Sequence, residues 1–320
     1  MKKILIMFLV VALMLPSVLL VEASAESKGT FGLVLGYRRD EFYMDLESRF
    51  LSAAKEAGYE ILVTDTDFDI ARSVSAIEDY TSAGVDAILT WGSAQFVTAI
   101  EAAVKAGIPV VCYDGSTPAE GIVTANVTYN PIEDGKAIGE WVKAYIEANW
   151  PAEEVEVAIL DFPASAEICV GRTNAFKSVI ESIPNAKIVA QMDGKASRAD
   201  SMAAAETILE ANPNVRVAYG INFDTIAGFF AALEGRGKTD TICVSSGSWG
   251  EEAINFLVEN HPQYKAFTLM NPWDMADASV KAAIDAIEGK EVVYDQSMLA
   301  RTYDASNINE LDYKLIINSR

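Results

Sequence analysis

The sequence is poor in the residues that carry most catalytic and metal chemistry. Its 320 residues contain one histidine, His261, and three cysteines, Cys112, Cys169 and Cys243. One histidine gives no zinc-ligand spacing, and any Ser-His-Asp or Cys-His arrangement would have to use it. No G-x-S-x-G nucleophile motif is present. We therefore expect a protein that is not an enzyme, with no cofactor and no metal site.

The cysteines also form no recognisable disulfide framework. Cys112 and Cys243 lie in apolar runs typical of strands, so we interpret them as buried thiols. The sequence leaves open whether any two of the three cysteines form a disulfide.

Positive charge is scarce as well. Lys and Arg total 25 against 46 Asp and Glu, giving a formal net charge of -21. Beyond Lys2-Lys3 there is no basic stretch, which argues against nucleic acid or an anionic membrane surface as a partner. The segment 235–239 (Gly-Arg-Gly-Lys-Thr) resembles a phosphate loop faintly, but its first required glycine is Ala232 and it leads from a helix into a strand. We exclude a phosphate-binding loop.

The N-terminus has the pattern of an export signal. Two lysines precede an apolar run over residues 4–21, and Ala23-Ser24-Ala25 follows as a small-residue cleavage site. The run is also near the length of a single membrane anchor, but Pro16 and the A-x-A site favour cleavage after Ala25. Since no cysteine stands there for lipid attachment, we predict a soluble periplasmic protein.

After the signal, strand-like and helix-like segments alternate at the spacing of an α/β fold with parallel sheets. Expected strands are 30–35, 59–64, 85–90, 108–113, 155–161, 186–192, 215–220, 241–245 and 265–269, with a short β tail. Expected helices are 42–57, 70–82, 94–106, 132–148, 171–182, 199–211, 223–234, 250–259 and 273–288. Residues 118–130 break the alternation with proline and glycine, and we interpret them as a crossing between two domains.

Asp114 is the most informative single position. It follows the apolar run 108–113 and precedes Gly115, a pair that favours a turn. In a parallel sheet the carboxyl ends of the strands border the crevice where ligands bind. A carboxylate placed there can accept hydrogen bonds from a small ligand. On its own, the residue is equally well explained as the start of a turn.

Six short segments, in this order and spacing, resemble the type I periplasmic solute-binding proteins of ABC importers, especially the ribose and glucose/galactose members. The segments are Asp40-Glu-Phe-Tyr, Ala57-Gly-Tyr-Glu, Ala106-Gly-Ile-Pro-Val-Val, Gly171-Arg-Thr-Asn-Ala-Phe176, Gly220-Ile-Asn-Phe-Asp224 and Thr268-Leu-Met-Asn-Pro272. The resemblance covers essentially the whole mature chain. It implies two Rossmann-like lobes joined by three crossings near residues 129, 269 and 299. The implied domains are a signal peptide (1–25), an N-terminal lobe (26–129 plus 270–299) and a C-terminal lobe (130–269 plus 300–320).

The resemblance also implies which residues contact the ligand. Asp40 corresponds to a carboxylate that binds sugar hydroxyls and Phe42 to an aromatic that stacks on the ring. Asp114 corresponds to a polar contact, Arg172 to a fork that bonds two oxygens, and Asn222 and Asn271 to amide contacts. We expect Arg172 to be a cleft side chain that is solvated when the lobes open, or else a brace of its helix. We add four aromatic residues near predicted strand ends to the expected site, with about half of all such aromatics serving only in packing: Tyr37, Tyr43, Trp91 and Trp249.

Several departures from the family pattern leave the ligand open. Gly115, Ala196 and Gly247 stand where the family commonly has polar, aromatic and acidic residues. The link 149–154 is too short and too poor in oxygens for the calcium loop of some glucose/galactose members. We expect a monosaccharide or related polyol, with a nucleoside as the alternative. The expected partner is an inner-membrane ABC permease, with a receptor kinase or chemoreceptor as the alternative, and the protein is expected to be a monomer.

Overall fold

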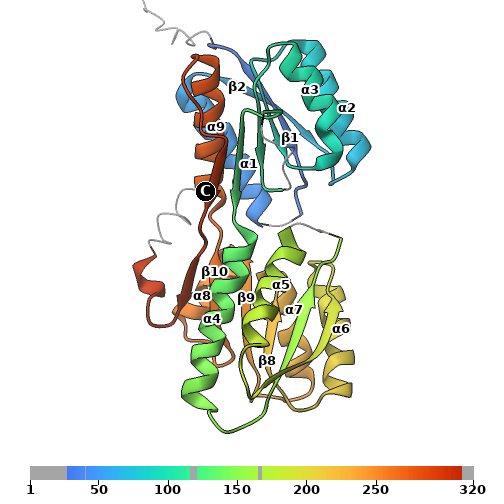
Figure 1. Cartoon of the computed structure of the whole chain (residues 1–320), viewed down its shortest axis with the longest axis vertical. Helices are drawn as coiled ribbons and strands as arrows, with labels where there is room; N and C mark the ends of the chain where they lie inside the picture. The colour runs from blue at the N-terminus through green and yellow to red at the C-terminus, as the bar shows by residue number, and fades with distance from the viewer. Residues whose placement is uncertain (1–26, 40, 116–120, 165–167, 312–320) are drawn as a thin grey trace, which may run out of the picture.

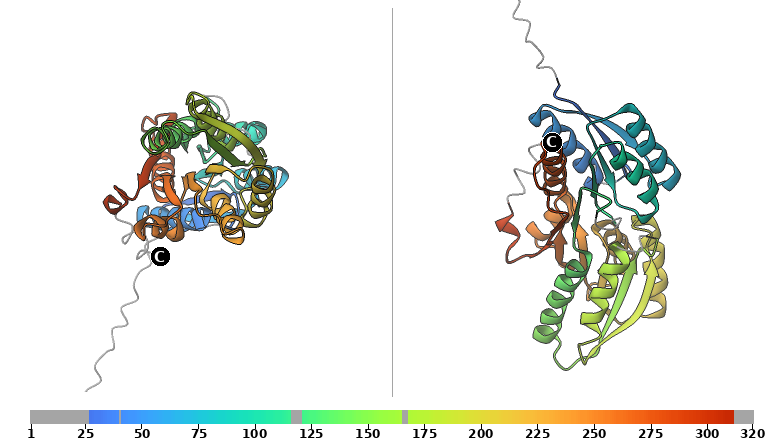
Figure 2. Two further views of the ribbon diagram at one scale, coloured as in Figure 1. Left: turned by 90° about the horizontal axis from the view of Figure 1, so that it is seen from below. Right: turned by 45° about the horizontal axis from the view of Figure 1, so that its top comes forward.

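The chain folds into two lobes, each built on a six-stranded sheet with helices on both faces (Figure 1). The structure is a computed structural model that describes residues 27–39, 41–115, 121–164 and 168–311. The expected signal peptide and Asp40 therefore lie outside the described residues. The right-hand view of Figure 2 shows the same two lobes from another direction.

The first sheet has the strand order β11-β5-β4-β3-β1-β2, and all its neighbours run parallel. Its strands are β1 (Thr30–Leu35), β2 (Glu60–Asp65), β3 (Ala87–Trp91), β4 (Val110–Tyr113), β5 (Ala125–Tyr129) and β11 (Asp295–Met298). The central strands are apolar and buried on both faces, as expected of a parallel sheet covered by helices.

Helices of the first lobe lie in two pairs. Helix α1 (Glu41–Ala57) packs beside α9 (Pro272–Ile287), and α2 (Ile70–Ala83) packs beside α3 (Val97–Lys105), which follows the short helix η1 (Ala94–Phe96). Figure 1 shows the two pairs on opposite faces of the sheet. Helix α9 comes from late in the chain, so the first lobe is completed only by a returning segment.

The second sheet has the order β12-β10-β9-β8-β6-β7, in which only β12 runs antiparallel to its neighbour. Its strands are β6 (Val155–Asp161), β7 (Ala186–Asp193), β8 (Val215–Gly220), β9 (Ile242–Ser248), β10 (Tyr264–Leu269) and β12 (Arg301–Asp304). Helices α4 (Pro131–Asn149) and α5 (Ile168–Ile180) pack together, as do α6 (Arg198–Ala211) and α7 (Phe223–Gly235). Helix α8 (Glu251–Val258) and the short helix η2 (Ile308–Glu310) complete this lobe.

One strand of this fold was not predicted from the sequence. Residues 118–130 were expected to be a crossing, yet Ala125–Tyr129 is β5, an internal strand of the first sheet. The prolines and glycine around it indicated a loop, although these five residues are buried like those of a core strand. The chain passes to the second sheet after β5, where Asn130 caps α4 with its side chain and Pro131 takes the first helical turn.

Candidate functional site

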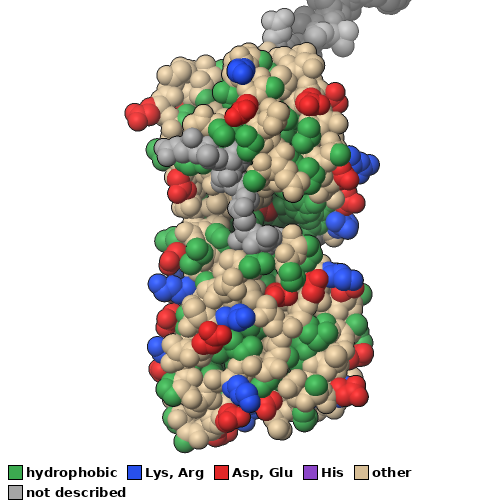
Figure 3. Space-filling view, turned by 45° about the vertical axis from the view of Figure 1, so that its right-hand side comes forward, with side chains coloured by type: hydrophobic (Ala, Val, Ile, Leu, Met, Phe, Trp, Pro, Cys, Tyr) green, Lys and Arg blue, Asp and Glu red, His purple; other side chains and the backbone are tan. Residues whose placement is uncertain are grey.

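The carboxyl ends of the parallel strands in both sheets converge on the space between the lobes. From the first lobe, Asp114 follows β4; from the second, Ile221 follows β8 and Gly247 lies at the end of β9. Figure 3 shows the surface hollowed between the lobes, with hydrophobic side chains in the visible part of the hollow. This is the position in which open α/β sheets bind ligands.

Asp114 is held by a tyrosine of the same lobe. The Tyr43 hydroxyl on α1 donates to Asp114 Oδ2 over 2.5 Å, and Tyr43 is itself buried. Burial raises the pKa of the Asp114 carboxyl, while the Tyr43 hydrogen bond and the positive charge of Arg172 oppose that rise. Arg172 belongs to the other lobe, so its charge reaches Asp114 across the cleft.

The turn that carries Asp114 is conformationally demanding. Asp114 itself has φ +35°, and Gly115 has φ +158°. A Cβ on Gly115 would stand 2.3 Å from the carbonyl oxygen of Gly92, which follows β3. Gly115 therefore allows the ends of β3 and β4 to approach closely, which explains physically why a side chain is absent from this position.

The side chain of Arg172 is almost completely enclosed by protein. It lies within α5, as expected, and only 5% of it is exposed. Its Nε lies 2.8 Å from Asp134 Oδ2, and its terminal nitrogens contact the Ile221 carbonyl at 3.4 Å and the Met270 sulfur at 2.6 Å. The guanidinium is thus enclosed largely by its own lobe and by the crossing after β10.

Asp134 is the site residue that the sequence analysis missed. It lies in the first turn of α4, where acidic residues commonly complement the helix dipole, so nothing in the sequence set it apart. In the structure it is 0% exposed and faces Arg172. Burial raises its pKa, while Arg172, Thr268 and the Gly247 N–H oppose the rise. A Cβ on the next residue, Gly135, would lie 2.1 Å from the Arg172 carbonyl oxygen, so glycine lets α4 and α5 approach closely here.

Two of the four added aromatics hold the first lobe together. Trp91 is buried at the end of β3, where its indole donates to Thr66 Oγ1 over 3.3 Å and packs against Phe68 and Phe96. Tyr37 stacks on Tyr43 with 4.7 Å between ring centroids, which supports the tyrosine that holds Asp114.

Two other aromatic residues connect the lobes. Phe42 is half-buried and packs against the hydrophobic cores of both. Trp249, just after β9, donates its indole N–H to Asp45 Oδ2 on α1 over 2.8 Å. Next to it, the Glu251 N–H donates to Glu41 Oε2 over 3.2 Å. These contacts bring α1 of the first lobe directly against the end of β9 and the start of α8.

The two predicted amide contacts both cap helices. Asn222 Oδ1 accepts from the Thr225 N–H over 2.9 Å at the start of α7. Asn271 Oδ1 accepts from the Trp273 N–H over 3.0 Å at the start of α9. Because capping uses the oxygen of each side chain, the amide nitrogen is the group that can donate to a ligand.

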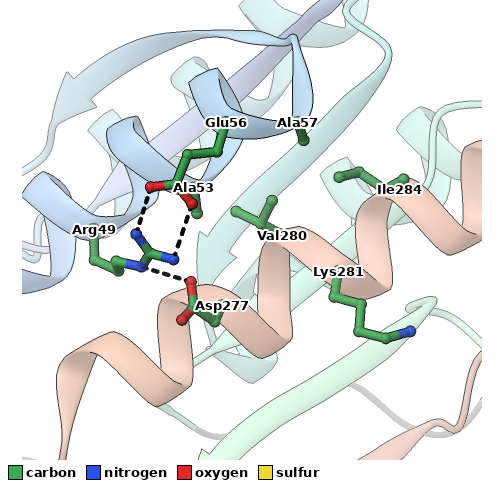
Figure 4. A pocket seen from close by; sticks show the side chains of 8 residues that line it. All are labelled: Arg49, Ala53, Glu56, Ala57, Asp277, Val280, Lys281 and Ile284. Atoms are coloured by element: carbon green, nitrogen blue, oxygen red, sulfur yellow. Dashed lines mark hydrogen bonds and ion pairs between the residues drawn. The ribbon is translucent and has the colours of Figure 1, made fainter.

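A separate surface pocket of about 350 Å³ lies between α1 and α9, away from the strand ends (Figure 4). Its one arginine, Arg49, is held by Glu56 at 2.9 Å and by Asp277 at 2.7 Å. Because the charge of Arg49 is balanced by these two carboxylates, the pocket does not have the convergent polar groups of the cleft.

The cysteines and the histidine of the described residues have structural roles. All three cysteines are buried and free, which answers the disulfide question. His261 Nδ1 accepts from the Tyr264 N–H over 3.0 Å, and the ring stacks on Phe256. Within the described ranges, no group of three or more His, Cys, Asp or Glu could hold a metal ion, and no helix has the length and apolar character to cross a membrane.

Comparison with known proteins gives consistent matches over most of the chain. The family model of the periplasmic binding protein domain matches residues 31–291. A D-apiose import binding protein of Actinobacillus succinogenes is 28% identical over 266 residues, covering 81% of this chain and 83% of that protein. The ribose import binding protein of Bacillus subtilis is 24% identical, with 82% and 83% covered.

Solved structures share the fold. An ABC transporter solute binding protein from Bacillus halodurans with bound myo-inositol has a TM-score of 0.80 at 22% identity, covering 90% of this chain and 98% of that one. An ABC transporter periplasmic solute binding protein from Actinobacillus succinogenes with bound D-allose also has a TM-score of 0.80, at 19% identity, with 89% and 100% covered.

Proposed function

Because this chain belongs to the periplasmic binding protein family, we propose that it captures a monosaccharide or related polyol between its two lobes and delivers it to an ABC import permease. The observation that carries the proposal is the meeting of polar groups from both lobes at the strand ends. Tyr43 and Asp114 come from the first lobe, and Arg172 from the second. A ligand that bonds to both sides stabilises the closed arrangement of the lobes.

The chemistry of the site fits a polyhydroxylated ligand. Carboxylate, guanidinium and amide groups can each bond two adjacent hydroxyls, and an aromatic side chain such as Phe42 can cover the C–H face of a sugar ring. Relatives of this chain are named for the import of D-apiose, ribose and D-allose. We assign the ligand contacts to Asp40, Phe42, Asp114, Arg172, Asn222 and Asn271, with Tyr43 holding Asp114.

Thermal unfolding in the presence of single sugars tests this function. D-apiose, D-ribose, D-allose and myo-inositol should be added separately to the purified mature protein. Ligand that binds only the folded state raises the melting temperature, by an amount that grows with its concentration over Kd. Calorimetric titration of the best probe should then show one site. If no sugar or polyol shifts the melting temperature, the proposed ligand class is wrong.

We further propose that the three crossings between the lobes, near residues 129, 269 and 299, form the hinge. Small-angle scattering should show a smaller radius of gyration at saturation with the best-binding sugar. An unchanged radius at saturation would contradict a closing clamp.

Export and assembly form a separate part of the proposal. We propose a monomer that begins at Glu26 after cleavage of residues 1–25 and works in the periplasm. Mass analysis of the periplasmic fraction should give a chain starting at Glu26. An intact Met1 in the membrane fraction would contradict cleavage.

A further inference from the structure

The charges of the described cleft do not leave a cation free for an anionic ligand. Arg172 is the cation at its centre, and two carboxylates act on it, those of Asp134, which is fully buried, and Asp114, which is half-buried. Asp134 is the closer, at 2.8 Å from Arg172 Nε. The attraction of a guanidinium for a carboxylate or phosphate group is strong when it is unpaired and buried. Here that interaction is already made within the protein.

The position of Arg172 depends on the shape of its own lobe. The guanidinium rests against Gly247, where a Cβ would lie 2.3 Å from Arg172 Nη1. Gly247 has φ +52°, and its N–H donates to Thr268 Oγ1 over 3.0 Å. A side chain at this position would displace the guanidinium from Asp134. Gly247 and the close packing of Gly135 on α5 therefore hold the two charges together.

An anionic sugar would meet an unfavourable field in this cleft. Its carboxylate or phosphate would lose water and approach Arg172, whose charge is already balanced by Asp134, while Asp114 faces it from the other lobe. Desolvating a charge without a new counter-ion is costly, whereas a hydroxyl needs only a donor or an acceptor. A neutral polyol can use the remaining N–H groups of Arg172 without that cost.

We infer that Asp134 is a specificity-determining residue, which acts as an internal counter-ion for Arg172 and restricts the cleft to uncharged polyhydroxylated ligands. The inference rests on the proposed function, since it divides the sugar class into neutral members, which bind, and acidic or phosphorylated members, which do not.

The test uses pairs of probes that differ in charge. D-glucose is compared with D-glucuronate, D-galactose with D-galacturonate, and myo-inositol with myo-inositol 1-phosphate, by thermal shift and calorimetry at one ionic strength. In the wild-type protein we expect binding only by neutral members. In D134N, the released Arg172 should improve the affinity of the anionic member, relative to its neutral partner, by about ten- to a hundredfold.

Two variants act as controls. Asp304→Asn removes one negative charge from the same lobe, at a carboxylate that accepts from Trp141 rather than from Arg172, and should leave the affinity ratio unchanged. The double variant R172Q/D134N removes both charges and should lose the gain in anion affinity, because Arg172 is the group that D134N releases.

The outcomes separate the inference from the function. Equal binding of both members by the wild-type protein, or an unchanged ratio in D134N, overturns the inference and leaves sugar binding intact. Binding by none of these probes and by none of D-apiose, D-ribose and D-allose removes the proposed ligand class, and the inference with it. Should D134N not fold, equal binding of paired probes by the wild-type protein still overturns the inference, and Asp134→Glu, which keeps the counter-ion, should keep the wild-type preference for the neutral member.

Discussion

The indole N–H of Trp249, just after β9, donates to Asp45 Oδ2 on α1 over 2.8 Å, and both residues are buried. This bond joins side chains of different lobes. Since it is made only while the lobes are in contact, it favours the closed arrangement in addition to any ligand contact.

Replacing Trp249 with Phe should therefore weaken sugar binding without unfolding the protein. A hydrogen bond to a charged group contributes about 1.5–3 kcal/mol. The loss corresponds to about a ten- to a hundredfold weaker affinity for the best-binding sugar, measured by calorimetry. The ligand-free variant should also have a larger radius of gyration.

Trp141 provides a matched control, because its indole donates to Asp304 over 2.7 Å within the second lobe. Trp141→Phe should lower stability and leave affinity unchanged. A double-mutant cycle of Trp249→Phe with Asp45→Ala should give a coupling energy. Purely additive effects would show that Trp249 acts on the ligand and not through Asp45.

Asp114 should make stability depend on pH in an unusual direction. Burial raises its pKa above the ordinary 3.8, so the folded protein binds this proton more readily than the unfolded chain. Its contribution to the free energy of unfolding falls as the pH rises from about 3.8 through the raised value. Asp114→Asn removes that loss, so the variant should gain stability over wild type across this window while losing affinity.

Asp304 should behave in the opposite way. Burial alone would raise its pKa, but hydrogen bonds from Ser306 and Trp141 outweigh burial and lower it. Its stabilisation is present above 3.8 and is lost as the pH falls through the lowered value. Asp304→Asn should be less stable than wild type at neutral pH and equal to it in acid.

Urea unfolding of the Asp114→Asn and Asp304→Asn variants at about pH 3–8 measures both predictions, because carboxylates titrate within this range. Parallel pH profiles for the two variants would refute the Asp114 assignment.

Removing Arg172 should now affect the fold as well as binding. Arg172→Gln leaves the Asp134 carboxylate buried without a counter-ion, a change that costs about 3–5 kcal/mol. The double variant R172Q/D134N should recover most of that loss, because no unpaired charge remains. Chemical denaturation of the two variants measures the difference. Full stability of the single variant would show that Asp134 is not held by Arg172.

Gly247→Ala should disturb the same arginine from the other side. The added Cβ meets Arg172 at 2.3 Å, and φ +52° is itself unfavourable for alanine. Gly84 isolates the second effect, because it has φ +69° with nothing within 4 Å of an added Cβ. Gly84→Ala should cost about 1–2 kcal/mol in thermal or urea unfolding and leave affinity unchanged. Gly247→Ala should cost more and should weaken sugar binding. Equal effects of the two substitutions would indicate that the space beside Arg172 is unimportant.

Most of the architecture could be predicted from the sequence because strands and helices alternate with clear hydrophobic patterns and glycine stops. The strand β5 was missed because its five residues, which lie between Gly121 and Pro131, carry little hydrophobic pattern of their own. Its place is fixed by pairing with β4 and β11. Local sequence cannot report such tertiary pairing.

The site was predicted less completely. The position of Asp114 directly after a strand was predicted correctly, and its role as a ligand contact, like that of Arg172, stays a prediction. The partner of Arg172, Asp134, could not be found, because the close approach of α4 and α5 at Gly135 arises only in the folded lobe. The capping roles of Asn222 and Asn271 follow from their positions before helices, and could have been anticipated from that pattern alone.

The strands β11 and β12 complete opposite sheets although they are neighbours in the sequence. During synthesis, neither sheet can acquire its full set of strands until residues 295–304 have left the ribosome. Before that point the first sheet lacks its edge strand β11 and the second lacks its edge strand β12. Both halves of the molecule therefore depend on the same short segment, residues 295–304, for the completion of their sheets.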